Sequence, residues 1–167
     1  GREVRDPYAP VVPERAAIAL DGEPAAAPAF RCLMLHKPRG VVTSARDPEG
    51  RRTVFDLARA AGETGRLVAV GRLDLATTGL LLLTNDTRLA DWLTDPARAV
   101  PRTYLATVRG ELTEPERVAL EAGVESDGER LAARAVAIRK RSRRETHLVV
   151  VLEQGRNREV RRLCAAV

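Results

Sequence analysis

Arg72 and Asp74 stand in a short polar segment between two apolar stretches, residues 67–70 and 80–83. Such stretches are typical of buried strands, and a loop between two anchored strands can present a carboxylate in a fixed position. A carboxylate can attack a substrate covalently or stabilise positive charge that develops on a sugar. The alternative is structural, because aspartate often caps a turn in its own loop, here near Thr77. Spacing alone favours the structural role.

Metal and disulfide chemistry have little support in the sequence. The two cysteines, Cys32 and Cys164, are too few for a disulfide scaffold, and neither lies in a CxxC pair. The two histidines, His36 and His147, lie far apart in the chain. A structural zinc site is therefore not expected, and a reduced, cytoplasmic protein is.

The charge of the chain suits a nucleic-acid partner. The formal net charge is +5, and only two of the 28 basic residues are lysines. Arginine binds phosphate through a planar fork and stacks on bases, which suits RNA. A GC-rich genome would also enrich arginine whatever the function, so the placement of the charges must decide. No apolar run reaches the roughly 18 residues that a membrane span needs.

The hydrophobic patterns predict strands and helices in irregular alternation, which favours an α+β fold whose mixed, largely antiparallel central sheet is flanked by helices. Thr53 and Thr113 are expected to cap helices, since an acidic residue follows each one three positions later. The run at 80–83 is expected to be core, covered on both faces. The predicted strands are 18–20, 32–36, 41–44, 67–70, 80–84, 102–109, 131–139 and 146–153, and the predicted helices are 53–61, 87–93, 113–122 and one from about 157.

The last helix combines an apolar stripe with several arginines. Val160, Leu163, Cys164 and Val167 follow the i, i+3, i+4, i+7 spacing of one helix face. The helix reaches the last residue of the sequence without a capping signal, and we expect the C-terminus to be truncated. The basic run 139–144 predicts a hairpin turn, which is usually only solvated but could touch RNA.

Four segments together resemble the RsuA/RluB type of ribosomal RNA pseudouridine synthases. The run GRLDLATTGLLLLTND at 71–86 resembles the signature of that family. Three further segments stand in the same order as in the family, one before this run and two after it, and extend the resemblance over residues 31–167: KPRG at 37–40, PRTYL at 101–105 and GRNREVRRL at 155–163. The last of them is closest to the RluB branch.

The resemblance implies a role for individual residues. It makes Asp74 the catalytic nucleophile, Tyr104 the ring that packs on the target uracil, and Arg161 the cation that pairs with the aspartate. It brings Arg72 to the RNA where the base is extruded. The remaining cations of the motifs are expected to bind RNA: Lys37, Arg39, Arg102, Arg156, Arg158 and Arg162. Arg102 departs from the family, which often has lysine there. Without the resemblance, Tyr104 reads as a core tyrosine and Arg161 as a solvated helix residue.

The implied reaction breaks the N1–C1′ bond of a uridine, turns the uracil, and joins C5 to C1′. It involves neither redox change nor hydrolysis, so no cofactor and no metal are expected. The target nucleotide must leave the base stack, and Arg72 could fill the vacated space. Arg158 and Arg162, four residues apart, repel unless an anion such as RNA phosphate lies between them. Attack at C1′, attack on the ring and a glycal route all stay open.

The resemblance also implies the organisation of the chain. Residues 1–28 are similar to the tail of an S4 RNA-binding domain followed by a linker, and residues 29–167 to the catalytic domain. The expected function is isomerisation of a specific uridine in ribosomal RNA, on the large subunit, by a monomeric enzyme without membrane contact. The alternative is a non-catalytic RNA-binding or ribosome-assembly module. A carboxylate-based hydrolase is disfavoured, since no second acid stands at a plausible spacing.

Overall fold

The computed structural model describes residues 4–6, 8–10, 12, 17–24 and 28–167. The chain divides into two compact units, Gly1–Phe30 and Arg31–Val167. In the first, β1 (Ala19–Leu20) and β2 (Glu23–Pro24) form an antiparallel hairpin whose turn residues Asp21 and Gly22 both have positive φ. The expected linker therefore begins with a hairpin. Pro7, Pro13 and Glu14 of the S4-like segment lie outside the described residues.

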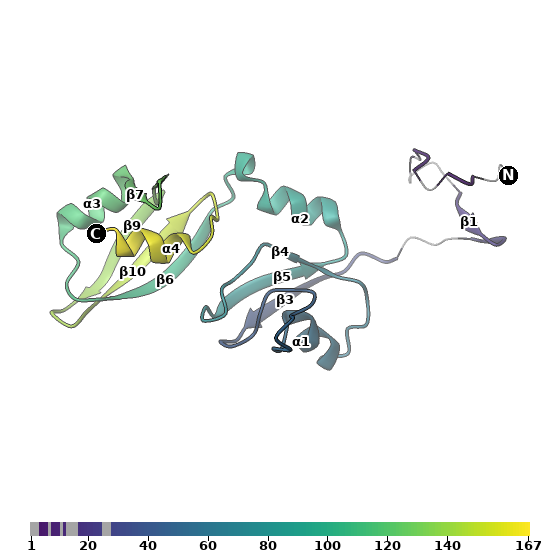
Figure 1. The fold of residues 1–167 in the computed structure, drawn as a ribbon, viewed down its shortest axis with the longest axis horizontal. Coiled ribbons are helices and arrows are strands. Elements are labelled where there is room, and N and C mark those ends of the chain that lie inside the picture. The colour runs from purple at the N-terminus through teal and green to yellow at the C-terminus, as the bar shows by residue number, and fades with distance from the viewer. Residues whose placement is uncertain (1–3, 7, 11, 13–16, 25–27) are drawn as a thin grey trace. The chain divides into compact units, whose positions relative to one another are not determined.

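The first half of the second unit is a three-stranded antiparallel sheet with the order β3-β5-β4. Its strands are β3 (Cys32–Lys37), β4 (Val68–Val70) and β5 (Gly79–Thr84). Helix α1 (Val54–Ala60) packs on one face of the sheet (Figure 1). Val54, Leu81 and Leu83 are buried together there. Apolar residues of β5 alternate across the sheet, and this alternation decides which of them reach the core.

Two expectations for this half are wrong. Leu80 is 64% exposed, because alternation along β5 places it on the face opposite the buried Leu81 and Leu83. Helix α2 (Thr87–Thr94) packs against β4 and β5 of the same sheet but leaves Leu80 exposed. The segment 41–44 does not form a strand either. Val42 makes one isolated parallel bridge to Thr53, with its N–H donated to Arg52, while the Thr43 side chain bonds elsewhere.

The helix caps follow local sequence rules. Thr53 is the expected N-cap of α1, and it forms a capping box there: Thr53 accepts the Asp56 N–H while Asp56 accepts the Thr53 N–H. Asp86 caps α2 by accepting two backbone N–H groups. A short 3-10 helix, η1 (Pro96–Arg98), then leads to the second half of the unit.

The second half is another three-stranded antiparallel sheet, with the order β6-β10-β9. Its strands are β6 (Arg102–Arg109), β9 (Ala135–Arg141) and β10 (Glu145–Leu152). Helices α3 (Glu114–Ala122) and α4 (Glu159–Ala165) pack against it (Figure 1). Leu120 of α3 and Leu163 of α4 are buried in one core with Leu148 and Val150 of β10.

The strand expected at 131–139 is divided in two. β7 (Val124–Ser126) and β8 (Glu129–Leu131) form a small hairpin, and β9 begins only at Ala135. The break arises because the Ala133 N–H bonds to Leu120 of α3 and the Arg134 N–H to Val151 of β10. Regular pairing of β9 with β10 therefore starts only at Ala135.

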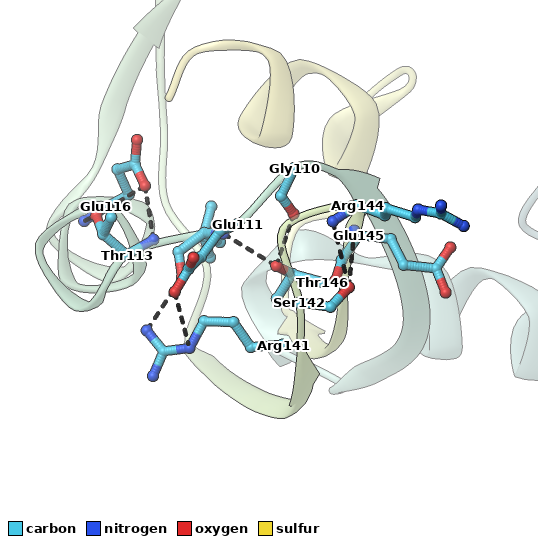
Figure 2. Close-up of polar contacts among 10 residues, drawn as sticks. Gly110, Glu111, Thr113, Glu116, Arg141, Ser142, Arg144, Glu145 and Thr146 are labelled. Atoms are coloured by element: carbon cyan, nitrogen blue, oxygen red, sulfur yellow. Dashed lines mark hydrogen bonds and ion pairs between the residues drawn. The ribbon is translucent and has the colours of Figure 1, made fainter.

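The β9–β10 hairpin is fixed at its tip by a buried threonine (Figure 2). Thr146 donates its hydroxyl to the Gly110 carbonyl and accepts the Leu112 N–H, which ties β10 to the loop before α3. Ser142 closes the turn by accepting the N–H groups of Arg144 and Glu145. The expected turn is therefore present, and the expected α+β class with antiparallel pairing is confirmed. No helix among the described residues is long and apolar enough to cross a membrane.

Candidate active site

Asp74 lies in the loop between β4 and β5, called here the aspartate loop (residues 71–78). The loop closes a turn in which the Thr77 N–H donates to the Asp74 carbonyl at 3.0 Å. The backbone oxygen, and not the carboxylate, therefore makes this turn. The Asp74 side chain is 31% exposed and remains available for chemistry.

The aspartate loop is tied on both sides of Asp74 to the segment 37–43. The Thr43 hydroxyl donates to the Leu73 carbonyl at 3.0 Å and accepts the Leu73 N–H at 3.3 Å. On the other side, the Gly40 N–H donates to the Leu75 carbonyl at 2.8 Å. Both neighbours of Asp74 in the chain thus have a bonded backbone.

Lys37, expected to contact RNA, is instead buried beneath this segment. It is 0% exposed, and its ammonium donates to the carbonyls of Pro38 and Val41 at 3.0 and 2.7 Å. Burial lowers the pKa of Lys37, and the negative charge of Asp74 opposes that shift. A side chain with no accessible surface cannot meet a phosphate, so the assignment of Lys37 to RNA is corrected to a structural role.

Arg161, from the second half of the unit, forms an ion pair with Asp74. Arg161 lies in the first turn of α4. The segment from the end of β10 to this residue, 153–161, is called here the arginine loop. The Arg161 Nε lies 3.6 Å from Asp74 Oδ2, and the arginine side chain is 48% exposed. The pair is close enough for the guanidinium to attract and orient the carboxylate, although solvent screens it partly.

The arginine loop is held by charged side chains. Arg102, half-buried, donates to the carbonyls of Leu93, Val100 and Glu153. It therefore joins the end of α2 to the end of β10, and its guanidinium is occupied by protein where sequence reasoning expected RNA. Glu159 is buried and accepts the Arg156 N–H at 2.8 Å, while its Oε1 has no partner among the described residues.

Arg162, also expected to bind RNA, is instead bonded to protein. Its guanidinium, 17% exposed, bonds to the backbone and hydroxyl of Ser126 and pairs with Asp127 and Glu129. The anions that compensate Arg162 are thus carboxylates of the β7–β8 hairpin, and no phosphate is needed to relieve repulsion from Arg158. Arg156 pairs with the same Glu129 at 3.2 Å.

Tyr104 lies on β6, half-buried, with its ring packed against the core of the second half. Burial raises the pKa of Tyr104, Arg102 opposes the shift, and Glu159 and Asp74 add to it. The hydroxyl therefore stays protonated at neutral pH and can donate or relay a proton, but it is a poor phenolate base.

These parts line one cleft of about 590 Å³, a volume within the range of ligand sites. Arg39, Arg72 and Arg158 line it, and each is exposed without a protein partner in the described part of the chain. Arg158 is held with a positive φ at the start of α4. Eight of the ten predicted site residues line the cleft: Asp74, Tyr104, Arg161, Arg39, Arg72, Arg102, Arg156 and Arg158. Lys37 and Arg162 do not.

Sequence reasoning missed two residues of the site. Thr43 follows the KPRG segment and carries no signal of its own, since its partner lies 30 residues away. Glu159 could have been noticed as the only acid within the basic run at 155–163. Among the described residues no group of three or more His, Cys, Asp or Glu side chains could hold a metal ion.

Comparison with known proteins agrees with this geometry. The model of the family described as RNA pseudouridylate synthase matches residues 31–166, which include the whole cleft. The chain belongs to the RNA pseudouridylate synthase family. The fold agrees, because a crystal structure described as a pseudouridylate synthase superposes with a TM-score of 0.65 at 29% identity, covering 82% of this chain and 57% of that one.

Relatives within the RNA pseudouridylate synthase family are similar over most of the chain. A ribosomal large subunit pseudouridine synthase B of Vibrio vulnificus is 42% identical over 156 residues, covering 90% of this chain and 48% of the relative. The protein of the same name in Yersinia pestis is 43% identical, covering 82% and 43%. An uncharacterized RNA pseudouridine synthase of Mycobacterium tuberculosis is 44% identical, covering 80% and 53%. The chain spans about half the length of these relatives.

Proposed function

We propose that this chain carries the catalytic centre of an enzyme that converts a uridine of large-subunit ribosomal RNA to pseudouridine, with Asp74 as the nucleophile. One observation carries the proposal: Asp74 and Arg161 lie 3.6 Å apart in a cleft that Tyr104 also lines. The choice of RNA follows the names of the relatives from Vibrio vulnificus and Yersinia pestis, which are ribosomal large subunit enzymes.

In this proposal the Asp74 carboxylate attacks the flipped nucleotide. Its attack at C1′ breaks the N1–C1′ bond and leaves an ester between Asp74 and C1′. The uracil turns, and C5 bonds to C1′ while the bond from C1′ to Asp74 breaks and restores the carboxylate. The C5 proton then leaves and N1 gains a proton, so the product is an isomer of the substrate. The aspartate loop is suited to this role because its backbone is bonded on both sides of Asp74, which reduces the cost of reaching a reactive geometry.

Arg161 and Tyr104 assist from the other half. The guanidinium holds the carboxylate toward the cleft and keeps its charge compensated when no substrate is bound. The Tyr104 ring offers an apolar face for the uracil, and its protonated hydroxyl can pass on the proton that leaves C5.

Three free cations supply the contacts to RNA. Arg39, Arg72 and Arg158 line the cleft without a protein partner among the described residues, so their guanidinium groups are available to phosphates or unstacked bases. Arg72 stands two residues before Asp74 and can stack in the space that the flipped nucleotide leaves.

The proposal is tested by mapping pseudouridine in ribosomal RNA from cells with and without the gene. Cells without it are complemented with wild type or with Asp74→Asn. We expect a large-subunit pseudouridine to vanish without the gene, to return with wild type and to stay absent with Asp74→Asn. An unchanged map of ribosomal RNA would overturn the assignment and favour a non-catalytic RNA-binding role.

A further inference from the structure

Thr43 contacts the backbone immediately before the proposed nucleophile. Its single hydroxyl serves both polar groups of Leu73, accepting the N–H at 3.3 Å and donating to the carbonyl at 3.0 Å. Leu73 itself is half-buried against the core of the first sheet. The residue next to Asp74 is thus fixed through its side chain by packing and through its backbone by one hydroxyl.

We propose that Thr43 is a positioning residue for Asp74, which sets the aim of the carboxylate without touching the substrate. The inference rests on the proposed role of Asp74 as nucleophile. Thr43 does not line the cleft, so its contribution must pass through the aspartate loop.

The surroundings of Thr43 make it a firm anchor. Lys37 is buried and holds the carbonyls of Pro38 and Val41, which fixes the segment that leads to Thr43. Val42 donates to Arg52 and accepts the Val54 N–H, which attaches the segment to the start of α1. The hydroxyl of Thr43 therefore belongs to a rigid support, and the aspartate loop is the part that it restrains.

A second hydrogen bond attaches the aspartate loop to the same segment, so the effect of the Thr43 hydroxyl on Asp74 can be separated from its effect on folding. Gly40, with a φ of +81°, donates its N–H to Leu75 on the far side of Asp74. Without the Thr43 hydroxyl, the loop is still attached at Leu75 but can rotate about that point. A displacement of about 1 Å at a nucleophile costs on the order of a hundredfold in rate, whereas binding of RNA to exposed arginines is insensitive to it.

Two substitutions separate the hydroxyl from the shape of the side chain. Thr43→Val keeps the β-branched shape and removes the hydroxyl, while Thr43→Ser keeps the hydroxyl and removes the methyl group. Thr113→Val is a matched control, since it removes the hydroxyl that caps α3, far along the chain from the aspartate loop. It tests whether loss of a threonine bond anywhere slows the reaction.

The experiment measures single-turnover pseudouridine formation at saturating RNA, together with RNA affinity. We expect Thr43→Val to slow turnover by about tenfold to hundredfold with RNA affinity within about twofold of wild type. Thr43→Ser should recover most of the rate, and Thr113→Val should turn over as wild type does. Hydrogen exchange of the Leu73 amide provides a second measurement, independent of activity: it should be faster in Thr43→Val and unchanged in Thr43→Ser.

The outcomes separate this inference from the proposed function. If Thr43→Val keeps wild-type turnover, or Thr43→Ser is as slow as Thr43→Val, the positioning role is wrong. If wild type makes no pseudouridine, the proposed function fails, and the exchange of the Leu73 amide still decides whether Thr43 restrains the loop.

Discussion

The aspartate loop and the arginine loop face each other across the cleft but are stabilised by different chemistry. The aspartate loop is tied by neutral hydrogen bonds from Thr43 and Gly40, above a buried Lys37. The arginine loop is tied by guanidinium and carboxylate groups, with Glu129 pairing Arg156 of the loop and also Arg162, the next residue of α4. Exposed ion pairs weaken with salt and acid, while neutral bonds do not. The proposed nucleophile is thus carried by the loop that is less sensitive to solution conditions.

The two loops are alike in one respect that the net charge of the chain does not show. Each contains one exposed arginine without a described protein partner, Arg72 in one loop and Arg158 in the other. Other cations nearby, including Arg102 and Arg162, are already bonded to protein. Availability of a cation to RNA therefore depends on what already binds it.

The largest effect on this comparison is expected from Arg161→Met. The substitution removes the one described ion pair between the two loops, so the Asp74 carboxylate loses its orienting charge. We expect turnover to fall by about tenfold to hundredfold at saturating RNA, with Arg161→Lys intermediate because it keeps charge but not the fork. Single-turnover kinetics measure this, and a rate for Arg161→Met within twofold of wild type would show that the loops act separately.

A smaller effect is expected from Arg72 and Arg158, the arginines of the two loops that have no partner among the described residues. Arg72→Gln and Arg158→Gln should each weaken RNA affinity and reduce the slope of log affinity against log salt by about one. Filter-binding titrations at several salt concentrations measure both quantities. Arg66→Gln, an exposed arginine outside the cleft, serves as the control and should bind as wild type. Equal slopes for all three variants would contradict the idea that RNA binds at the cleft arginines Arg72 and Arg158.

The smallest effect is expected from acid. Hydrogen bonding to Arg162 lowers the pKa of Glu129. A carboxyl whose pKa is lower in the folded state adds stability above its unfolded pKa, and this is lost as the pH falls through the folded value. Glu129→Gln should therefore lower the melting temperature near pH 7, and its difference from wild type should shrink as the pH falls below the unfolded pKa of the carboxyl. Glu125→Gln, an exposed neighbour on β7, should differ little at neutral pH; a similar loss for both would contradict the account.

The sequence predicts those features that depend on neighbours in the chain. The capping boxes at Thr53 and Thr113 could be predicted because both partners lie within three residues. The exposure of Leu80 could not, since it depends on which helix covers the far face of the sheet.

The same distinction holds for the candidate site: the sequence predicts some properties of its residues and not others. The motifs identified the residue types at Asp74, Tyr104 and Arg161, which line one cleft. They could not separate a buried cation such as Lys37 from a free one such as Arg39. That difference arises from the surrounding chain: the Lys37 ammonium bonds two backbone carbonyls, whereas the Arg39 side chain is exposed.

The central claim is tested most directly by comparing purified wild type and Asp74→Asn on large-subunit ribosomal RNA that contains the mapped uridine. Asparagine keeps the size of the side chain and removes the negative charge, so RNA binding should stay within about twofold. We predict a full single turnover to pseudouridine with wild type and none detectable with Asp74→Asn. Pseudouridine formed by Asp74→Asn at the wild-type rate would contradict the account.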